Sequence, residues 1–283
     1  MPFDPAAAPA TGFQAAIEFS RDPSGKTYVS RQHVGYPFHL GRALSSPGDP
    51  AGMPTLYLQS CAGGLFDGDD LRLRIAAGES AAAHVTTGAS TIVHSTDTHP
   101  ARQFAELHVA PGATLEYLPD PAILFPRARL DSRVKLRLHP DATVIVGDSI
   151  LLHDPRGGDG LFGWAKSETR IEDPTGRLQV CDRFQVDGAA MARGLPGVTG
   201  RFAAQGSLFV ATKQKPAAAL VEAVRGAIGR EGIYGGVGLL PNQAGAWARI
   251  LAVDAAALRT AMFAAWSAAR QLLSGSAPAP RRK

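Results

Sequence analysis

Two short stretches of the chain concentrate side chains that could bind a metal ion. In the first, Gly63-Gly64-Leu65-Phe66-Asp67-Gly68-Asp69-Asp70, three carboxylates fall within four residues, and the glycines let the backbone turn tightly. Carboxylate oxygens are the ligands that hard cations prefer. The alternative is a glycine-rich turn whose aspartates accept hydrogen bonds from their own backbone. An EF-hand loop is excluded, because its acidic residues recur at offsets that this stretch lacks.

The second stretch, residues 86–99, holds hydroxyls and two imidazoles. His94, Asp97 and His99 could meet a transition metal if the chain folded back on itself. His-x2-Asp-x-His is not an established ligand spacing, however. The chain has eight histidines spread along its length, so the alternative is a chance grouping. We therefore expect at most weak metal binding here.

Carboxylates also serve in glycoside hydrolysis, which needs two of them in one cleft. Asp148, Asp154 and Asp159 lie on or beyond a predicted strand and are the candidates for such a pair. The chain has no Gly-x-Ser-x-Gly elbow, no His-Glu-x-x-His, no P-loop and no Gly-x-Gly-x-x-Gly leading into a helix. A β-solenoid enzyme acting on polysaccharides stays open as the alternative to a protein without catalytic activity.

Charge and cysteine content limit the kinds of partner and the cellular compartment that the sequence supports. Arg281, Arg282 and Lys283 account for three of the 29 Lys and Arg residues, and the remaining 26 balance 25 Asp and Glu residues. Such a body offers no basic stripe for a nucleic acid. Cys61 and Cys181 are the two cysteines of the sequence, and they indicate a reducing compartment while leaving a bond between them open.

The first residues of the sequence do not indicate a targeting segment. Residues 1–12 hold alanines and prolines instead of a basic segment followed by an apolar core, so a secretory signal is not supported. No apolar run approaches the roughly 20 residues that span a bilayer. We expect a cytoplasmic protein with a flexible N-terminus at 1–14 and a disordered basic tail at 275–283.

Most of the sequence indicates β-structure. Three segments restart in the same way, with a turn, a small residue and a β-rich run, and Gly78, Gly112 and Asp141 mark intervals of 34 and 29 residues. Such intervals are typical of supersecondary units that stack on one another. Alternating or β-branched runs predict strands at residues 13–19, 27–34, 55–60, 71–75, 81–87, 91–94, 104–109, 115–118, 134–138, 143–146 and 178–186.

The pattern changes near residue 213. Apolar residues at helical spacing predict helices at about 216–229 and 254–273, with Asp254 as the N-cap of the second. Between them we expect a glycine-rich connection at 234–245 and a short strand at 247–253. The prediction is therefore a mainly β chain, with a solenoid-like body of stacked strands at 15–212, a helical cap at 213–274, and one domain spanning 15–274.

Five blocks in this order resemble the family of the urease accessory protein UreD, also called UreH. These blocks are residues 31–39 (RQHVGYPFH), 63–69 (GGLFDGD), 86–93 (TTGASTIV), 112–125 (GATLEYLPDPAILF) and the Leu-Leu-Pro segment before the last helix. The resemblance covers about residues 25–273. It implies a β-superhelical body with two helices and a role as a scaffold instead of an enzyme.

The resemblance also implies partners and a cargo. Proteins of this kind bind UreF, which recruits the GTPase UreG, and they dock on apo-urease so that nickel reaches its active site through a polar passage. No tightly bound cofactor is implied, only nickel in transit. A stand-alone nickel-storage protein is the further alternative, and the sparse thiols and imidazoles disfavour it. On this reading we expect the passage to be lined by Asp67, Asp69, Asp70, Thr86, Thr87, Ser90 and His94.

The alternative for these seven residues is that they only complete turns and strand ends. For the partner surface we expect the helical end of the molecule, because a helix face beside a β body suits a helical partner. Arg259 and Arg270 are predicted to point outward there, while Met262 and Trp266 lie in the middle of the apolar stripe.

Overall fold

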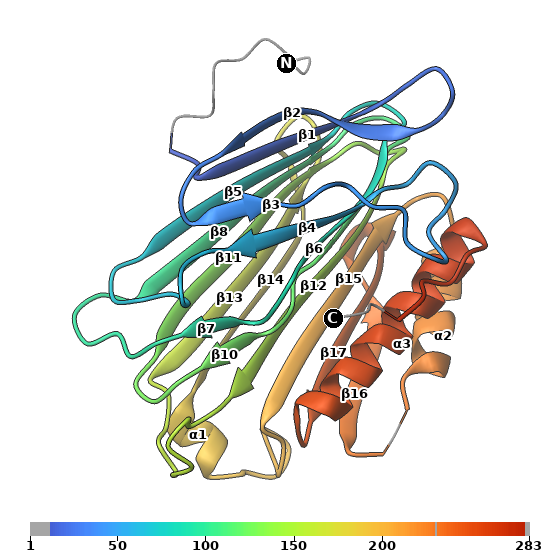
Figure 1. Ribbon diagram of the computed structural model, residues 1–283. Coiled ribbons are helices and arrows are strands. Elements are labelled where there is room, and N and C mark those ends of the chain that lie inside the picture. The colour runs from blue at the N-terminus through green and yellow to red at the C-terminus, as the bar shows by residue number, and fades with distance from the viewer. Residues whose placement is uncertain (1–11, 230, 281–283) are drawn as a thin grey trace.

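Two β-sheets face each other in a sandwich, and two helices lie against the outer face of one of them (Figure 1). The computed structural model describes residues 12–229 and 231–280. The seven-stranded sheet has the order β14-β13-β11-β8-β5-β1-β2, and the ten-stranded sheet runs β16-β17-β15-β12-β9-β6-β4-β3, with β10 and β7 attached beside β12.

The bounds of the strands are β1 Ala15–Arg21, β2 Thr27–Val34, β3 Phe38–Leu40, β4 Thr55–Ser60, β5 Asp70–Ala77, β6 Ala82–Thr87, β7 Thr91–Val93, β8 Ala101–Val109, β9 Thr114–Leu118, β10 Ala122–Leu124, β11 Arg129–Leu138, β12 Thr143–Leu152, β13 Trp164–Glu172, β14 Leu178–Asp187, β15 Ala204–Thr212, β16 Ile233–Leu239 and β17 Gly245–Ala252. The helices are α1 Gly188–Ala192, α2 Ala217–Ala227 and α3 Ala255–Ser274, with a 3-10 turn at Pro241–Gln243.

The predicted repeat is a stack of coils. Each coil contributes one strand to each of the two sheets. As a result β5, β8 and β11 are parallel neighbours in one sheet, and β6, β9 and β12 are parallel neighbours in the other. The turns between them also stack, since Thr114 N–H donates to Ala81 O and Thr143 N–H donates to Ala113 O. The mainly β, solenoid-like prediction is confirmed.

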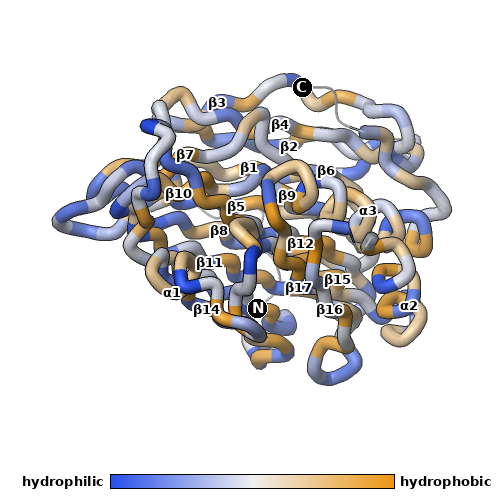
Figure 2. Tube along the Cα trace, turned by 90° about the horizontal axis from the view of Figure 1, so that it is seen from below, coloured by the Kyte–Doolittle hydropathy of each residue, from blue (hydrophilic) through white to orange (hydrophobic). Residues whose placement is uncertain are grey.

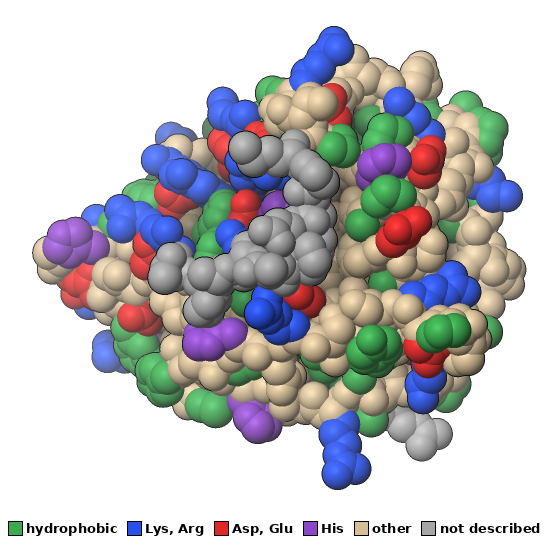
Figure 3. Space-filling model, turned by 90° about the horizontal axis from the view of Figure 1, so that it is seen from above, with side chains coloured by type: hydrophobic (Ala, Val, Ile, Leu, Met, Phe, Trp, Pro, Cys, Tyr) green, Lys and Arg blue, Asp and Glu red, His purple; other side chains and the backbone are tan. Residues whose placement is uncertain are grey.

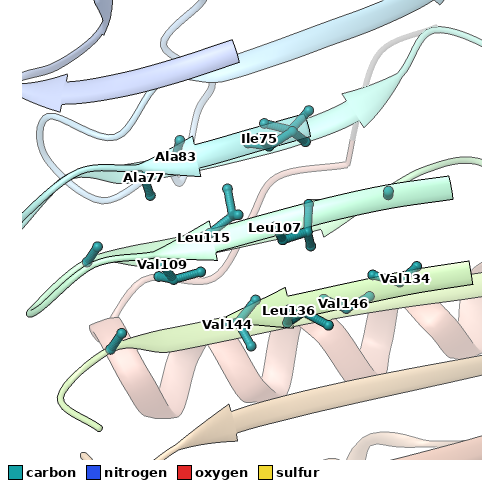
Figure 4. Packing of buried hydrophobic residues seen from close by; sticks show 14 of the residues in the cluster. Ile75, Ala77, Ala83, Leu107, Val109, Leu115, Val134, Leu136, Val144 and Val146 are labelled. Atoms are coloured by element: carbon teal, nitrogen blue, oxygen red, sulfur yellow. The ribbon is translucent and has the colours of Figure 1, made fainter. Parts of the chain in front are cut away.

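Side chains that point inward from successive coils form layers between the sheets. Figure 4 shows Ile75, Leu107 and Leu136 from the seven-stranded sheet facing Leu115 and Val144 from the other sheet. Because side chains alternate across a strand, these residues share one face while the polar residues between them point outward. In Figure 2 hydrophobic stretches accordingly follow the strands in the middle of the molecule.

The two long helices end where the sequence predicts. Asp254 accepts a hydrogen bond from Ala257 N–H at 2.8 Å and so caps the start of α3. Gly275, with φ of 75°, ends α3 in the left-handed conformation that glycine adopts without a Cβ penalty. Both helices pack on β17, and α3 also reaches β15.

Several elements differ from the prediction. The sequence patterns did not indicate β3, β10, β13, β15 and the five-residue helix α1, and they predicted a connection where β16 lies. Glycines weaken the strand signal of β16, but its backbone pairs with β17 along the whole strand. Since β16 and β17 join the ten-stranded sheet, residues 213–274 contribute strands as well as helices.

The end of the chain also differs from the prediction of a disordered tail. Pro278 is buried, and Ala279 N–H donates to Pro47 O at 3.1 Å, so residues 275–280 pack on the loop before β4. Residues 281–283, which carry the predicted basic charge, lie outside the described residues, as do residues 1–11 of the predicted flexible N-terminus. No helix within 12–229 and 231–280 is long and apolar enough to cross a membrane.

Candidate functional site

A row of polar residues points into the sandwich from the ten-stranded sheet. Asp148 on β12 pairs in register with Ser207 on β15, Ser207 pairs with Arg249 on β17, and Arg249 pairs with Gly236 on the edge strand β16. Their neighbours along each strand, such as Val146 and Ile150 beside Asp148, belong to the apolar core. The polar row therefore crosses the sheet at one level.

The seven-stranded sheet carries a matching row at the same level. Ser132 on β11 pairs in register with Gln103 on β8 and with Ser167 on β13. Gln103 Nε2 donates to Ser132 Oγ at 2.9 Å, and Ser167 Oγ donates to Asp148 Oδ2 across the sandwich. We call the two rows together the polar belt, defined by Gln103, Ser132, Ser167, Asp148, Ser207 and Arg249.

The polar belt borders a cavity of about 510 Å³ between the sheets. Gln103, Ser132 and Asp148 line it from the belt, and residues 58–65 and 87–92 line it at the β4 side. One core cluster, which contains Leu73 and Val134, lies on one side of the belt, and another, which contains Leu130 and Ile150, lies on the other. Two apolar core clusters thus meet at a cavity whose wall mixes polar residues of the belt with apolar residues such as Leu58 and Phe104.

Asp120 lines this cavity from the turn between β9 and β10, and the belt contributes a second carboxylate, Asp148. Burial raises the pKa of Asp148 above the ordinary value, and the hydrogen bond from Ser167 and the charge of Arg249 oppose that effect only in part. Burial also raises the pKa of Tyr117, which lines the same cavity and faces the charge of Asp148. A carboxylate that is poorly solvated attracts a cation strongly when it is ionised.

Arg249 lies where the belt approaches the edge of the sandwich. One of its terminal nitrogens lies 2.6 Å from Asp182 Oδ2 on β14. The guanidinium carbon lies 4.9 Å from the centre of the Phe184 ring and 5.1 Å from that of Trp247, both within the range of cation–π contacts. The pair therefore joins the last strand of one sheet to β17 of the other.

Two of the seven residues predicted to line a passage do line the cavity. Thr87 and Ser90 belong to its wall at the β4 side. Thr87 Oγ1 accepts a hydrogen bond from Asp120 N–H at 2.8 Å. Thr86, the neighbour of Thr87, points away to the opposite face of the strand, where it is buried and donates to Leu118 O at 2.6 Å.

The three predicted aspartates lie outside the cavity wall, with Asp67 and Asp69 in the loop before β5 and Asp70 at the start of β5. Asp67 accepts hydrogen bonds from the backbone N–H groups of His99 at 2.5 Å and Thr98 at 2.8 Å, and these bonds lower its pKa. Asp69 accepts from Phe66 N–H at 2.8 Å, and Asp70 pairs with an arginine of its own strand, Arg72, at 2.9 Å. These contacts correspond to the turn alternative for this stretch.

His94 lies outside the cavity wall as well. Its ring stacks on Phe66, with ring centres 4.4 Å apart, and meets the edge of Phe125 at 5.4 Å. Its Nε2 lies 3.0 Å from Gly63 O. Within the described residues no group of three or more His, Cys, Asp or Glu side chains could hold a metal ion, and Cys61 and Cys181 are free.

The prediction that Arg270 points outward is wrong. Its side chain is 2% exposed, donates to Glu116 Oε1 at 2.8 Å and to Asp49 Oδ1 at 2.8 Å, and lies over the Trp266 ring at 4.6 Å. His84 completes the cluster, with Nδ1 2.9 Å from Glu116 Oε2. We call these five residues the α3 clasp, because they fix the helix to the sheet and to the loop before β4.

Burial opposes the ionised form of Glu116, but hydrogen bonds from His84 and Arg270 outweigh it and lower the pKa of Glu116. The clasp explains why an arginine occurs in the stripe that helical spacing marks as buried. Arg259, the other predicted partner residue, is exposed near the start of α3. Trp266 is buried, as its place in the stripe indicates.

Sequence patterns missed most of the polar belt, although they contain a signal for it. Ser132 interrupts the alternation Leu130, Val134, Leu136, and Asp148 interrupts the series Val144, Val146, Ile150. A polar residue at an inward position of one strand is unremarkable by itself. Several of them mark a polar layer only when the register between strands is known.

Comparison with known proteins places the chain in one family. A model of the UreD urease accessory protein family matches residues 11–283. The chain is 48% identical over 270 residues to urease accessory protein UreD 1 of Pseudomonas syringae pv. tomato, covering 95% of both chains. It is 39% identical over 283 residues to the UreD 1 protein of Methylorubrum populi, covering 100% of this chain and 96% of the relative. It is 32% identical over 278 residues to the UreD protein of Natronomonas pharaonis, covering 95% of this chain and 90% of the relative.

Proposed function

Because this chain belongs to the UreD family of urease accessory proteins, we propose that it brings UreF and UreG to apo-urease in the cytoplasm and conducts nickel through the cavity along the polar belt. Membership in a family of accessory proteins agrees with the prediction that the chain is not an enzyme. The observation that carries the conduction proposal is the cavity itself, which lies between two apolar core clusters and is lined by the half-buried carboxylate of Asp148 together with hydroxyl and amide groups of the belt.

The donor set of the cavity suits transit better than storage. Its wall offers hydroxyls, amides and carboxylates, for example those of Thr87, Ser132, Gln103, Asp120 and Asp148. Late divalent metals bind oxygen ligands less tightly than nitrogen or sulfur ligands. Cys61 is a free, exposed cysteine at the β4 side of the wall.

The test compares nickel loading of urease with and without this chain. Urease subunits, UreF and UreG are expressed together with the wild-type chain, with no chain, or with Asp148→Asn, at matched protein abundance. We expect the nickel content of purified urease to fall without the chain, and to fall at least several-fold with Asp148→Asn, because the neutral amide removes the charge that attracts the ion.

The matched control is Asp141→Asn, which alters an exposed carboxylate in the turn that precedes the same strand, β12. Wild-type nickel content with Asp148→Asn would refute conduction along the belt. Asp69→Ala tests the predicted lining separately, and unchanged nickel content there would remove Asp69 from the path.

For the partner surface we propose the exposed side of α2 and α3. Both helices bury an apolar stripe on the sheet and leave polar residues such as Arg259 and the Glu222–Arg225 pair on the outside. We expect Arg259→Glu to weaken retention of UreF in a pull-down, whereas Arg177→Glu, an equal reversal in the exposed turn between β13 and β14, leaves it unchanged. Full retention by Arg259→Glu would argue against this surface.

A further inference from the structure

The cavity ends at Asp148, and a charged pair stands beyond it. Ser207 and Arg249 follow Asp148 in register on the next two strands, so Arg249 is placed roughly 10 Å further along the belt. Arg249 is paired with Asp182, and both side chains are about one quarter exposed, at 28% and 24%. The pair thus lies between the interior and the solvent.

Glycines border the outer side of this pair. Gly236 pairs in register with Arg249 and Gly238 with Trp247, and a Cβ atom added to either glycine would meet no atom within 4 Å. Open space therefore adjoins the guanidinium at the edge strand β16. A larger side chain at position 236 would occupy that space.

The hydrogen bonding of Arg249 leaves donors unused. Its Nε and the indole Nε1 of Trp247 are buried without a hydrogen-bond partner among the described residues. Buried donors of this kind are uncommon, and an unpaired one marks strain, a functional role, or a place for water or an ion. The aromatic rings of Phe184 and Trp247 hold the guanidinium without fixing all of its donors.

From these observations we infer that Arg249, paired with Asp182, is a charge gate that closes the cavity toward the β14–β16 edge of the sandwich. The inference rests on the proposed conduction of nickel. An arginine keeps its positive charge at every accessible pH. A divalent cation held at Asp148 meets that charge on its way outward, and it passes only when the guanidinium moves toward the open space beside Gly236 and Gly238.

If Arg249 is a charge gate, two substitutions should change the rate of nickel exit in opposite directions. Arg249→Met keeps an apolar side chain between the rings of Phe184 and Trp247 and removes the positive charge, so nickel should leave the cavity faster. Asp182→Asn keeps the shape of the side chain but removes the counter-charge, so the repulsion from Arg249 increases and nickel should leave more slowly. Loss of a purely structural contact would slow transfer, or leave it unchanged, in both variants.

The experiment measures the initial rate at which nickel enters purified apo-urease after Ni²⁺ is added to a mixture with UreF, UreG and the full chain, with nickel determined by mass spectrometry. We expect Arg249→Met to raise the rate about threefold or more, and Asp182→Asn to lower it by a similar factor. Arg249→Lys restores a charge and should bring the rate back toward that of the wild type. Arg249→Gln is the second charge-free variant, for use if the methionine variant does not fold.

The matched control is Arg183→Met, which removes a guanidinium from the outward face of the same strand as Asp182. The thermal unfolding midpoint of each variant is recorded alongside. A rate in Arg249→Met or Arg249→Gln that equals or falls below the wild-type rate, with a wild-type midpoint, overturns the gate. If the wild-type chain does not accelerate nickel loading at all, the proposed function fails instead, so the two failures are distinguishable.

Discussion

The α3 clasp allows one stability prediction to be worked out in detail. Arg270→Met removes the guanidinium while keeping most of the side-chain volume over Trp266. Glu116 and Asp49 then remain in the interior without their partner, with side chains only 2% and 4% exposed. A buried ion that loses its partner cannot recover its hydration, so the folded state is destabilised.

The size of the effect follows from the same contacts. Removing one member of a buried ion pair costs about 3–5 kcal/mol. The cation–π contact with Trp266 adds to the loss, while the hydrogen bonds that Asp49 keeps from Ser46 N–H and Thr55 Oγ1 reduce it. For a chain of this size we expect the unfolding midpoint to fall by on the order of 10 °C.

The assay is urea or thermal unfolding followed by circular dichroism, with a double-mutant cycle of Arg270→Met and Glu116→Gln. The double variant carries one uncompensated carboxylate fewer than Arg270→Met alone. We therefore expect its destabilisation to be smaller than the sum of the two single effects by about 1–3 kcal/mol. Arg259→Met, on the exposed side of the same helix, is the matched control and should change stability by less than about 0.5 kcal/mol.

Two results would refute this reasoning. A loss below about 1 kcal/mol in Arg270→Met would show that the interior solvates the carboxylates without the arginine. Strict additivity in the cycle would show that Arg270 and Glu116 do not stabilise one another, despite their contact.

Three further predictions concern single positions. Because the pKa of Asp148 is raised in the folded chain, the unfolding free energy should decline as pH rises from 3.8 through that raised pKa. Asp148→Asn should remove this decline and should be at least as stable as the wild type near neutral pH. The hydrogen bond with His108 and the charge of Arg74 lower the pKa of Glu106 from 4.5 to about 2, so the ionised carboxylate stabilises the fold above pH 4.5 and this stabilisation is lost as pH falls toward 2. Glu106→Gln should therefore weaken the pH dependence of the unfolding free energy between pH 4.5 and 2. Gly245 has φ of 142°, and an added Cβ would lie 1.9 Å from Val210 O, so Gly245→Ala should cost at least about 2 kcal/mol in chemical denaturation.

The architecture could be predicted from the sequence because it depends on local patterns. Turn residues such as Gly78 and Gly112 recur at nearly even intervals, and inward and outward residues alternate between them. These two signals are sufficient for a stack of parallel strands. The strand β16 was missed because its glycines give no alternation, and only the pairing with β17 defines it.

The candidate site could be predicted only in part. Polar residues that are close in sequence, such as Asp67, Asp69 and Asp70, were predicted to line a passage. In the structure Asp67 and Asp69 complete loops and Asp70 pairs with Arg72 on β5. The polar belt instead takes one residue from each of several strands, and its members are separated by tens of residues. Register between strands brings Asp148 and Arg249 to one level, and a single sequence does not reveal register.

Arg270 shows the same limit on a helix. Helical spacing marked the buried stripe of α3 correctly, since Trp266 and Ala269 are both in the interior. An arginine beside them was expected to face the solvent, because buried arginines are rare unless they are paired. Its partners, Glu116 and Asp49, come from a strand and a loop that no sequence pattern connects to the helix.

Figure 3 shows acidic and basic side chains interspersed over the face that is seen from above, without a large area of one sign. This distribution agrees with the balanced charge of the body in the sequence and with the expectation that nucleic acid is not a partner.

During synthesis the N-terminal part of the chain emerges from the ribosome first, and it can begin to fold before the rest is made. The coils that contain β6, β9 and β12 can stack in the order of synthesis, because each contacts its predecessor. Glu116 and His84, however, stay exposed on the outer surface of the growing sheet until position 270 has been translated. The nascent protein therefore exposes the polar side chains of Glu116 and His84 together with the apolar surface on which α3 later packs, and this surface is covered only after α3 has been translated.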